Sequence, residues 1–294
     1  YAQSEEIERE LEFWTSAPNQ PVAHLPLDFE GGENIVSSVK THSISLTEEE
    51  TKQILHEVPK SYRTQINDVL LTALSRSMKS WTRRGALLVD FEAHGREHSF
   101  DDIDLTRTVG WFTSIYPVVL ETPEGGDIGV HLKAVKERLR TVPGGGIGYG
   151  LLRYVRGDAG IAEKIKSRGE AEVVFNYGGQ FDQSLPESSP FSLAKESPGS
   201  ARSPRALRRY LLEINAFVIK GQLTLYWTYS ENLHRRETIE RVAAGMMEEL
   251  RAIIAHCRGL ETAAYTPSDF PAAKLSQKDL DKLMGKIKQV ERGV

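Results

Sequence analysis

The sequence predicts an α/β or α+β fold, because segments that alternate like strands are interleaved with segments of helical periodicity. The clearest strands are residues 86–94 and 171–177, and a helix is predicted between them over 128–141. The strongest helix, residues 64–82, carries a row of apolar side chains on one face. With 294 residues, the chain can form one large domain or two modest ones.

The first elements are predicted from capping signals and alternation. Ser4 can cap a helix over residues 4–15. Residues 35–46 alternate in polarity, which predicts a strand. Thr47 and the three glutamates after it form a capping box, so a helix begins here and ends before Pro59.

The later elements include a hairpin that turns at Lys220-Gly221. Before the hairpin, the sequence predicts a strand over 116–121, a flexible glycine-rich loop over 143–148 and a long loop over 183–206. The hairpin strands cover 209–219 and 222–230. A helix over 235–257, an extended link over 266–271 and a basic helix over 275–290 follow.

Composition and charge exclude several protein classes. The net charge is −4 and the pI is about 6.1, so the broad basic footprint of a nucleic-acid-binding protein is missing. The single cysteine, Cys257, cannot form an internal disulfide, which fits a reducing compartment. No apolar run approaches the roughly 20 residues of a membrane span. We therefore expect a cytoplasmic protein without a membrane or nucleic-acid partner, cut from a longer chain because it lacks an initial Met.

Common catalytic motifs are also missing. The eight histidines and the cysteine show no metal-ligand spacing, so no metal site is expected. There is no Gly-x-Ser-x-Gly nucleophile elbow. The segment 143–150 lacks the Lys-Ser/Thr of a phosphate-binding P-loop.

The most informative residue is Glu92, near the end of the strand over 86–94. Alternation places it with Asp90 and His94 on the face opposite Phe91. Partial burial of Glu92 would raise its pKa toward neutrality, as proton transfer near pH 7 requires. The alternative is a structural ion pair of Glu92 with His94 or Arg96.

Two further blocks carry polar groups beside glycines. One runs from Thr106 through the aromatic pair Trp111 and Phe112 into a strand; a fixed functional loop and ordinary core packing are both open. The other, 175–182, ends the strand over 171–177, where glycines let a ligand approach the backbone. Because both strands end in glycine-bounded polar motifs, we expect them to converge in one central sheet with Glu92 close to Asn176.

A local basic cluster near residue 205 has two interpretations. It is either a solvated surface or a docking site for an acidic partner or a phosphate. Its members are Arg202, Arg205, Arg208 and Arg209.

Five ordered blocks give the chain its family resemblance. They are Asn67–Leu74 (Asn-Asp-Val-Leu-Leu-Thr-Ala-Leu), Glu92–Glu97 (Glu-Ala-His-Gly-Arg-Glu), Arg107–Pro117 (Arg-Thr-Val-Gly-Trp-Phe-Thr-Ser-Ile-Tyr-Pro), Pro143–Gly150 and Phe175–Asp182. Together they resemble the epimerization domain of nonribosomal peptide synthetases, a member of the condensation-domain superfamily. The resemblance covers essentially the whole chain.

The resemblance implies a fold and also shows departures. It implies a chloramphenicol-acetyltransferase-like lobe with a mixed central sheet and flanking helices, one half of a two-lobed fold. Ala93 replaces the family's Gly, and Gly178 its Leu. The family's His-His-x-x-x-Asp motif is absent, so the chain resembles the C-terminal lobe. We expect a linker helix over 1–20, the lobe over 21–272 and a terminal helix or linker over 273–294.

The implied activity is inversion of Cα, from L to D, in an aminoacyl or peptidyl thioester. The substrate is carried on the 4′-phosphopantetheine arm of a carrier domain, with no metal or pyridoxal cofactor. Glu92 matches the family's acid/base, whose partner is the histidine of the missing motif. Asn176 and Tyr177 are expected to stabilise the enolate-like oxygen or position the thioester, and Tyr177 to relay a proton. The residues expected at the substrate are His94, Arg96, Trp111, Thr113, Ser114 and Tyr149.

The same resemblance implies the partners. They are a peptidyl carrier domain, the N-terminal lobe and neighbouring synthetase modules, and the chain alone is expected to be inactive without the histidine lobe. One alternative is a peptide-bond-forming condensation domain of the same superfamily. A second is a truncated, non-catalytic carrier-docking module. The blocks at 92–97 and 107–113 favour epimerization, and a neighbouring His-His-x-x-x-Asp lobe would favour an enzyme.

Overall fold

A computed structural model describes residues 1–16, 21–96, 104–180, 190, 196, 199, 201–260 and 263–291, with the backbone alone for 287–291. One sheet has the strand order β1-β6-β5-β4-β2-β3. Its strands are β1 (Val39–Ser45), β2 (Ala86–Ala93), β3 (Ser114–Glu121), β4 (Val173–Gln180), β5 (Leu212–Ile219) and β6 (Gln222–Ser230). The strand β4 is parallel to β2 and to β5, and the other pairs are antiparallel. The predicted mixed sheet is therefore confirmed.

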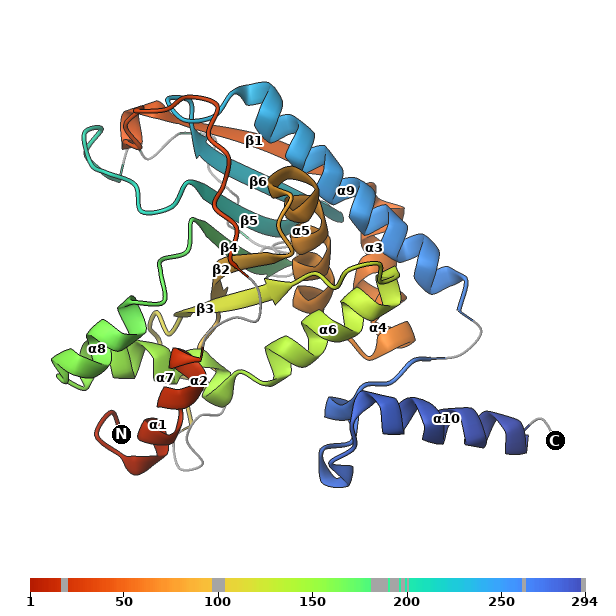
Figure 1. Ribbon diagram of the computed structural model, residues 1–294. Helices are drawn as coiled ribbons and strands as arrows, with labels where there is room; N and C mark the ends of the chain where they lie inside the picture. Colours follow the sequence, from red (N-terminus) through yellow and green to blue (C-terminus); the bar gives the residue numbers. More distant parts are fainter. Residues whose placement is uncertain are drawn as a thin grey trace.

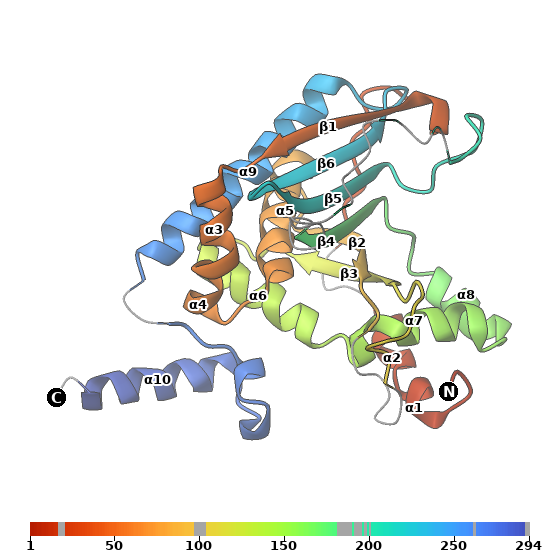
Figure 2. The ribbon, with the colours of Figure 1, turned by 180° about the vertical axis from the view of Figure 1, so that it is seen from behind.

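Helices cover one face of this sheet (Figures 1 and 2). The helices of the described chain are α1 (Glu5–Arg9), α2 (Leu11–Thr15), α3 (Glu48–His56), α4 (Val58–Tyr62), α5 (Ile66–Thr82), α6 (Ile128–Arg140), α7 (Ile147–Gly150), α8 (Ala159–Lys166), α9 (Arg236–Arg258) and α10 (Gln277–Glu291). The covering layer consists of α3, α5, α6 and α9, which contact β6, β2, β3 and β1 respectively. We call the opposite side of the sheet the open face.

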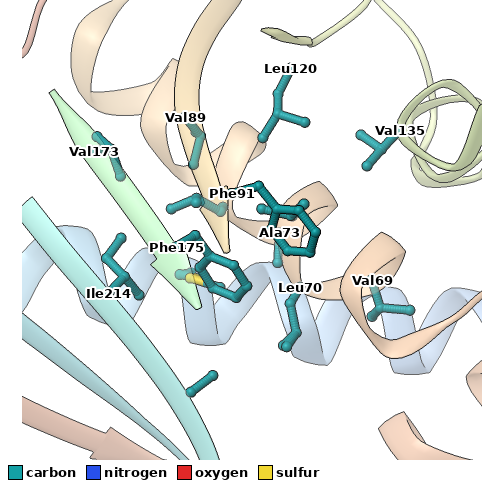
Figure 3. Close-up of a cluster of buried hydrophobic side chains, with 14 of the residues drawn as sticks. Val69, Leu70, Ala73, Val89, Phe91, Leu120, Val135, Val173, Phe175 and Ile214 are labelled. Carbon is teal, nitrogen blue, oxygen red and sulfur yellow. The ribbon is translucent and has the colours of Figure 1, made fainter. Parts of the chain in front are cut away.

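The core lies between the sheet and α5. Alternate residues of β2 and β4, such as Val89, Phe91 and Phe175, are buried against Leu70 and Ala73 of α5 (Figure 3). Figure 3 shows these side chains meeting between the strands and the helix. The predicted packing of the helix over 64–82 on the central sheet is confirmed. The intervening residues of each strand point to the open face.

Several element boundaries match their predictions. Thr47 forms the predicted capping box with Glu50 at the start of α3. The hairpin turns at Lys220 and Gly221, whose φ angles of 51° and 71° are those of a type I′ turn. Most of the loop predicted over 183–206 lies outside the described residues.

Other predicted boundaries need correction. The single helix over 4–15 is broken at Glu10, and Val36–Ser38 is a 3₁₀ turn rather than the start of a strand. The helix that begins after Thr47 does end before Pro59, at His56, but Pro59 itself lies in the first turn of a further helix, α4, where its missing N–H is tolerated. The link over 266–271 contains two 3₁₀ turns, Pro267–Asp269 and Pro271–Ala273.

The glycine-rich segment is also not the flexible loop that we predicted. Pro143–Gly146 forms a 3₁₀ turn that leads into α7 and a π-helical turn, Leu151–Val155. Gly146 has a φ of +88°, and a Cβ there would lie 1.9 Å from the Tyr116 ring. The glycines therefore allow a tight helical entry against β3.

A buried lysine connects the C-terminal segment to the helical layer. Lys136 of α6 is 2% exposed, and its Nζ donates to the backbone oxygen of Tyr62 at 2.9 Å and to both carboxylate oxygens of Asp269 at 2.8 Å. Removing one partner of a buried ion pair leaves the other charge uncompensated.

We expect Lys136→Ala to lower the free energy of unfolding by about 3–5 kcal/mol, measured by urea denaturation. Lys133→Ala on the same helix is the matched control. Lys133 forms a more exposed pair with Asp281 at 3.6 Å, and its loss is expected to cost less than about 1 kcal/mol. Equal losses in both variants would contradict this account.

Candidate active site

The end of β2 brings Glu92 next to two asparagines on the open face. In the sheet register Glu92 pairs with Asn176 of β4, and Asn176 pairs with Asn215 of β5. The Asn176 amide nitrogen donates to the Asn215 side-chain oxygen at 3.3 Å. Residues paired across neighbouring strands lie on the same face of a sheet. The predicted convergence of Glu92 and Asn176 is therefore confirmed, and Asn215 is an addition that the sequence analysis missed.

The Glu92 carboxyl group is half-buried and forms no hydrogen bond or ion pair with the residues that the structure describes. Burial raises the pKa of Glu92 above its ordinary value. A carboxyl group of this kind holds its proton more readily than one in water. It is thus chemically suited to exchange a proton with a bound molecule.

The alternative of a structural ion pair is not supported in the described part of the chain. The Arg96 guanidinium donates instead to the backbone oxygens of Leu105, Thr108 and Gly110, at 2.8, 3.0 and 3.2 Å. It also lies over the Phe112 ring, 4.4 Å from the centroid. Arg96 therefore holds the segment from 104 to 112 in place.

His94 and Gly95 complete this turn. The exposed His94 accepts the backbone N–H of Arg96 on Nδ1 at 3.1 Å. Gly95 has a φ of +65°, and a Cβ there would lie 1.6 Å from the backbone oxygen of Phe112. A larger residue would push the turn apart. Glu97, which ends this motif, lies outside the described residues.

The aromatic pair that follows does not pack in the core as a unit. Trp111 is 86% exposed, whereas Phe112 is half-buried beneath Arg96. Thr113 and Ser114 are half-buried where β3 begins, and Ser114 pairs with Ala93 at the end of β2. The segment thus presents Trp111 to the surroundings from a fixed loop.

Tyr177 and Asn176 lie on opposite faces of the sheet. Tyr177 pairs with the buried Ala216 and packs against the core, whereas Asn176 pairs with Asn215 on the open face. Burial raises the pKa of the Tyr177 hydroxyl. The strand does not end at 177 but continues with an irregularity to Gln180.

Gly178 lies under an aromatic ring. A Cβ at Gly178 would lie 2.1 Å from the Phe217 ring, so Phe217 occupies the space where the family has a leucine side chain. Phe181 and Asp182 lie outside the described residues.

Glu92, Asn176 and Asn215 lie side by side on neighbouring strands, and we call them the asparagine row. Tyr149 lies at the β3 edge of the sheet rather than in this row. It is 6% exposed, its ring is 5.4 Å from that of Trp14, and its hydroxyl accepts a hydrogen bond from Arg153. Burial raises the pKa of Tyr149. Its hydroxyl thus already has a partner within the chain.

A buried acid two residues before Glu92 organises the same face. Asp90 is 2% exposed and accepts hydrogen bonds from Arg209 at 3.0 Å and from the Tyr210 hydroxyl at 2.7 Å. Burial is also the largest cause that raises the pKa of Asp90. Asp90 alternates onto the polar face as predicted, but no sequence signal indicated these partners.

The four arginines near residue 205 do not form one exposed cluster. The Arg208 side chain is 2% exposed and pairs with Glu213 at 3.0 Å, and Arg209 pairs with Asp90. Arg202 and Arg205 are exposed. Both interpretations of the cluster, a solvated surface and a docking site, are therefore wrong for Arg208, which is a buried structural residue.

Comparisons with known proteins agree with this architecture. Residues 1–276 match the family model described as "Condensation domain". The chain belongs to the condensation-domain family. It is 43% and 45% identical to two of the proteins that make up linear gramicidin synthase of Brevibacillus parabrevis. Each match covers 99% of this chain, but only 4% and 6% of those proteins.

Two solved structures are similar to this condensation-family chain. The epimerization domain from the third module of tyrocidine synthetase B has a TM-score of 0.79 and 35% identity. That match covers 87% of this chain and 57% of the solved one. A four-domain nonribosomal peptide synthetase bound to AMP and glycine has a TM-score of 0.62 and 15% identity, which shows the fold alone. This second match covers 85% of this chain and 19% of the solved one.

Two other kinds of feature are not found in the described chain. No group of three or more His, Cys, Asp or Glu side chains in the described ranges could hold a metal ion. None of the helices that the structure describes is long and apolar enough to cross a membrane.

Hydrogen exchange can test whether the hydrogen bonds of Arg96 stabilise the loop over residues 104–112. Hydrogen bonds to a charged group contribute about 1.5–3 kcal/mol, so we expect Arg96→Ala to speed amide exchange over residues 104–112 by roughly 10- to 100-fold. Arg107→Ala is the matched control, because Arg107 is an exposed residue of the same loop. Unchanged exchange in Arg96→Ala would contradict this role.

The Glu92 environment predicts a pH-dependent stability. Burial raises the pKa of Glu92 in the folded protein, so the folded state favours the protonated carboxyl group. The protonated group therefore contributes its whole share of the free energy of unfolding below the pKa of the unfolded state. This share is lost as the pH rises through the pKa of the folded state. We expect Glu92→Gln to be more stable than the wild type at pH 7 and equally stable below about pH 4. Urea denaturation at both pH values measures this, and a structural ion pair would give the opposite sign at pH 7.

Proposed function

We propose that this chain is the C-terminal lobe of an epimerization domain, which inverts Cα of an aminoacyl or peptidyl thioester on a carrier domain. The observation that carries the proposal is the half-buried Glu92 carboxyl, which has no partner in the described chain and is aligned with Asn176 and Asn215. Similarity to a solved epimerization domain at 35% identity supports the same reaction.

In this mechanism Glu92 exchanges a proton with Cα. The thioester carbonyl makes the Cα–H acidic, and the Glu92 carboxylate takes the proton to leave an enolate. A second group on the opposite side returns a proton to Cα, and the thioester reforms with inverted configuration. The raised pKa of Glu92 makes its carboxylate a better base than an exposed glutamate.

Asn176 is the proposed oxyanion donor. Its amide nitrogen already lies toward the row and donates to Asn215 at 3.3 Å, a long contact that a stronger acceptor can displace. A neutral donor aimed at developing negative charge stabilises the enolate more than the ground state. Tyr177, which packs on the helical side, is proposed to support the position of β4 rather than to relay a proton.

The second acid/base is proposed to come from the N-terminal lobe, which the family resemblance equips with the His-His-x-x-x-Asp motif. The carrier domain and neighbouring modules are the proposed partners, since this chain spans only 4% to 6% of the gramicidin synthase proteins that it matches. The three-part division of the chain and its cytoplasmic location remain predictions.

Deuterium exchange at Cα of a carrier-bound substrate tests the role of Glu92. In the longer protein that supplies both lobes, we expect Glu92→Gln to slow exchange by about 10²–10⁴-fold, because an amide cannot carry the proton. The fold is retained, since Gln is nearly isosteric. Glu231→Gln, which changes a half-exposed surface glutamate, is the control.

Two results would overturn the proposal. One is normal exchange in a folded Glu92→Gln protein. The other is peptide-bond formation without any Cα exchange in the wild type, which would make the domain a condensation enzyme.

A further inference from the structure

A pocket opens at the β3 edge of the sheet, away from the asparagine row. It is enclosed by α2, α6, α7 and the end of α8, which gather beside β3 in Figure 1. Its walls are mainly apolar and include Phe13, Trp14, Leu88, Pro117, Val119 and Ile165. Two cationic side chains, Arg138 and Arg168, also line it.

Neither of these arginines forms an ion pair with a carboxylate in the described ranges. Arg138 lies over the Phe13 ring, 5.2 Å from its centroid, and Arg168 donates to the backbone oxygen of Trp14 at 3.2 Å. The nearby Arg153, in contrast, forms an ion pair with Glu170 at 3.2 Å. The pocket thus concentrates two positive charges that the described side chains do not neutralise by contact.

The energetics of the pocket favour an added anion. Burial lowers the pKa of both arginines, and the charge of Arg138 lowers that of Arg168 further. The charge of Glu121 acts on the pKa of Arg138 in the opposite direction. Like charges held beside apolar walls repel one another, and a bound anion relieves this repulsion.

We propose that this pocket binds a phosphate group between the guanidinium groups of Arg138 and Arg168. A planar guanidinium offers paired N–H donors that match oxyanions. The two oxygens of a carboxylate satisfy one such fork, whereas the tetrahedral oxygens of a phosphate can accept from two forks in different directions. Phosphate is therefore the better match for two arginines from separate elements.

The position of the pocket indicates a source for the phosphate. Leu88 in its wall lies four residues before Glu92 on β2, about 13 Å along the strand. Both side chains point to the open face. This source rests on the proposed epimerization: a phosphopantetheine arm that passes outside Arg209 and Tyr210, which cover Asp90 between Leu88 and Glu92, can place its phosphate at the arginines and its thioester near Glu92. Free phosphate is the other source of the same chemistry.

Calorimetric titration of the full chain with inorganic phosphate, at constant ionic strength set by chloride, tests the site without any reaction. We expect saturable binding that weakens at least tenfold in Arg138→Gln/Arg168→Gln. Arg9→Gln is the control, because the Arg9 side chain is 78% exposed, and it is expected to bind phosphate normally. Equal affinity in the wild type and the double variant would overturn the site.

Two further arms keep the test decisive. Circular dichroism checks the fold of each variant. If Arg138→Gln/Arg168→Gln unfolds, Arg138→Lys/Arg168→Lys replaces it. The lysine variant keeps both charges but loses the paired N–H donors of the guanidinium groups, so it should also bind phosphate more weakly.

Holo and apo carrier domains then identify the source of the phosphate. If the arginine changes weaken holo-carrier binding but not apo-carrier binding, the phosphate is that of the arm. If only inorganic phosphate binding weakens, the site takes free phosphate. Neither result depends on Glu92 chemistry, so this site and the proposed reaction can fail separately.

Discussion

The parallel pairing of β4 with β2 and β5 is the constraint on which the candidate site depends. Parallel strands end at the same edge of a sheet, so the register alone brings Glu92, Asn176 and Asn215 into one row. A shift of one residue in either pairing would turn Asn176 toward the helices and replace it with Tyr177 or Phe175. The buried residues between them, which pack on α5, prevent that shift. The core thus fixes the chemistry of the open face, although no core residue takes part in it.

The turn that follows β2 lies at the same end of the strands as Glu92, Asn176 and Asn215. Gly95 lets the backbone pass within contact of Phe112, and Arg96 then satisfies the carbonyls of a segment that has little secondary structure of its own. One cation therefore replaces the hydrogen bonds that a strand or helix would supply. Because Arg96 is occupied in this way, the Glu92 carboxyl has no counter-charge in the described chain. Arg96, the arginine of the motif over residues 92–97, stabilises the loop and does not pair with Glu92. The Glu92 carboxyl group is therefore available to a bound molecule.

Much of this arrangement could be predicted from the sequence, and the misses have physical causes. Alternation along β2 placed Glu92 on the polar face, because a strand pattern is local. The contact between Asn176 and Asn215 could not be predicted, since it depends on which strands are neighbours. Arg208 belonged to a basic cluster in the sequence, yet its burial is decided by distant partners such as Asn34 and Thr228. Glycines 144–146 suggested flexibility, but the Tyr116 ring requires the missing side chain at Gly146.

The opposite faces of Asn176 and Tyr177 limit what one lobe can do. Adjacent strand residues cannot both reach a substrate on one side of a regular sheet, so only Asn176 shares the side of Glu92 among this pair. In the proposed reaction, Glu92 takes one proton and Asn176 stabilises one oxyanion. Inversion needs a second proton donor on the far side of Cα, and a sheet face offers no group there. A stereochemical inversion built on this row therefore requires a surface that faces the sheet from outside, which is where a second lobe would supply its acid.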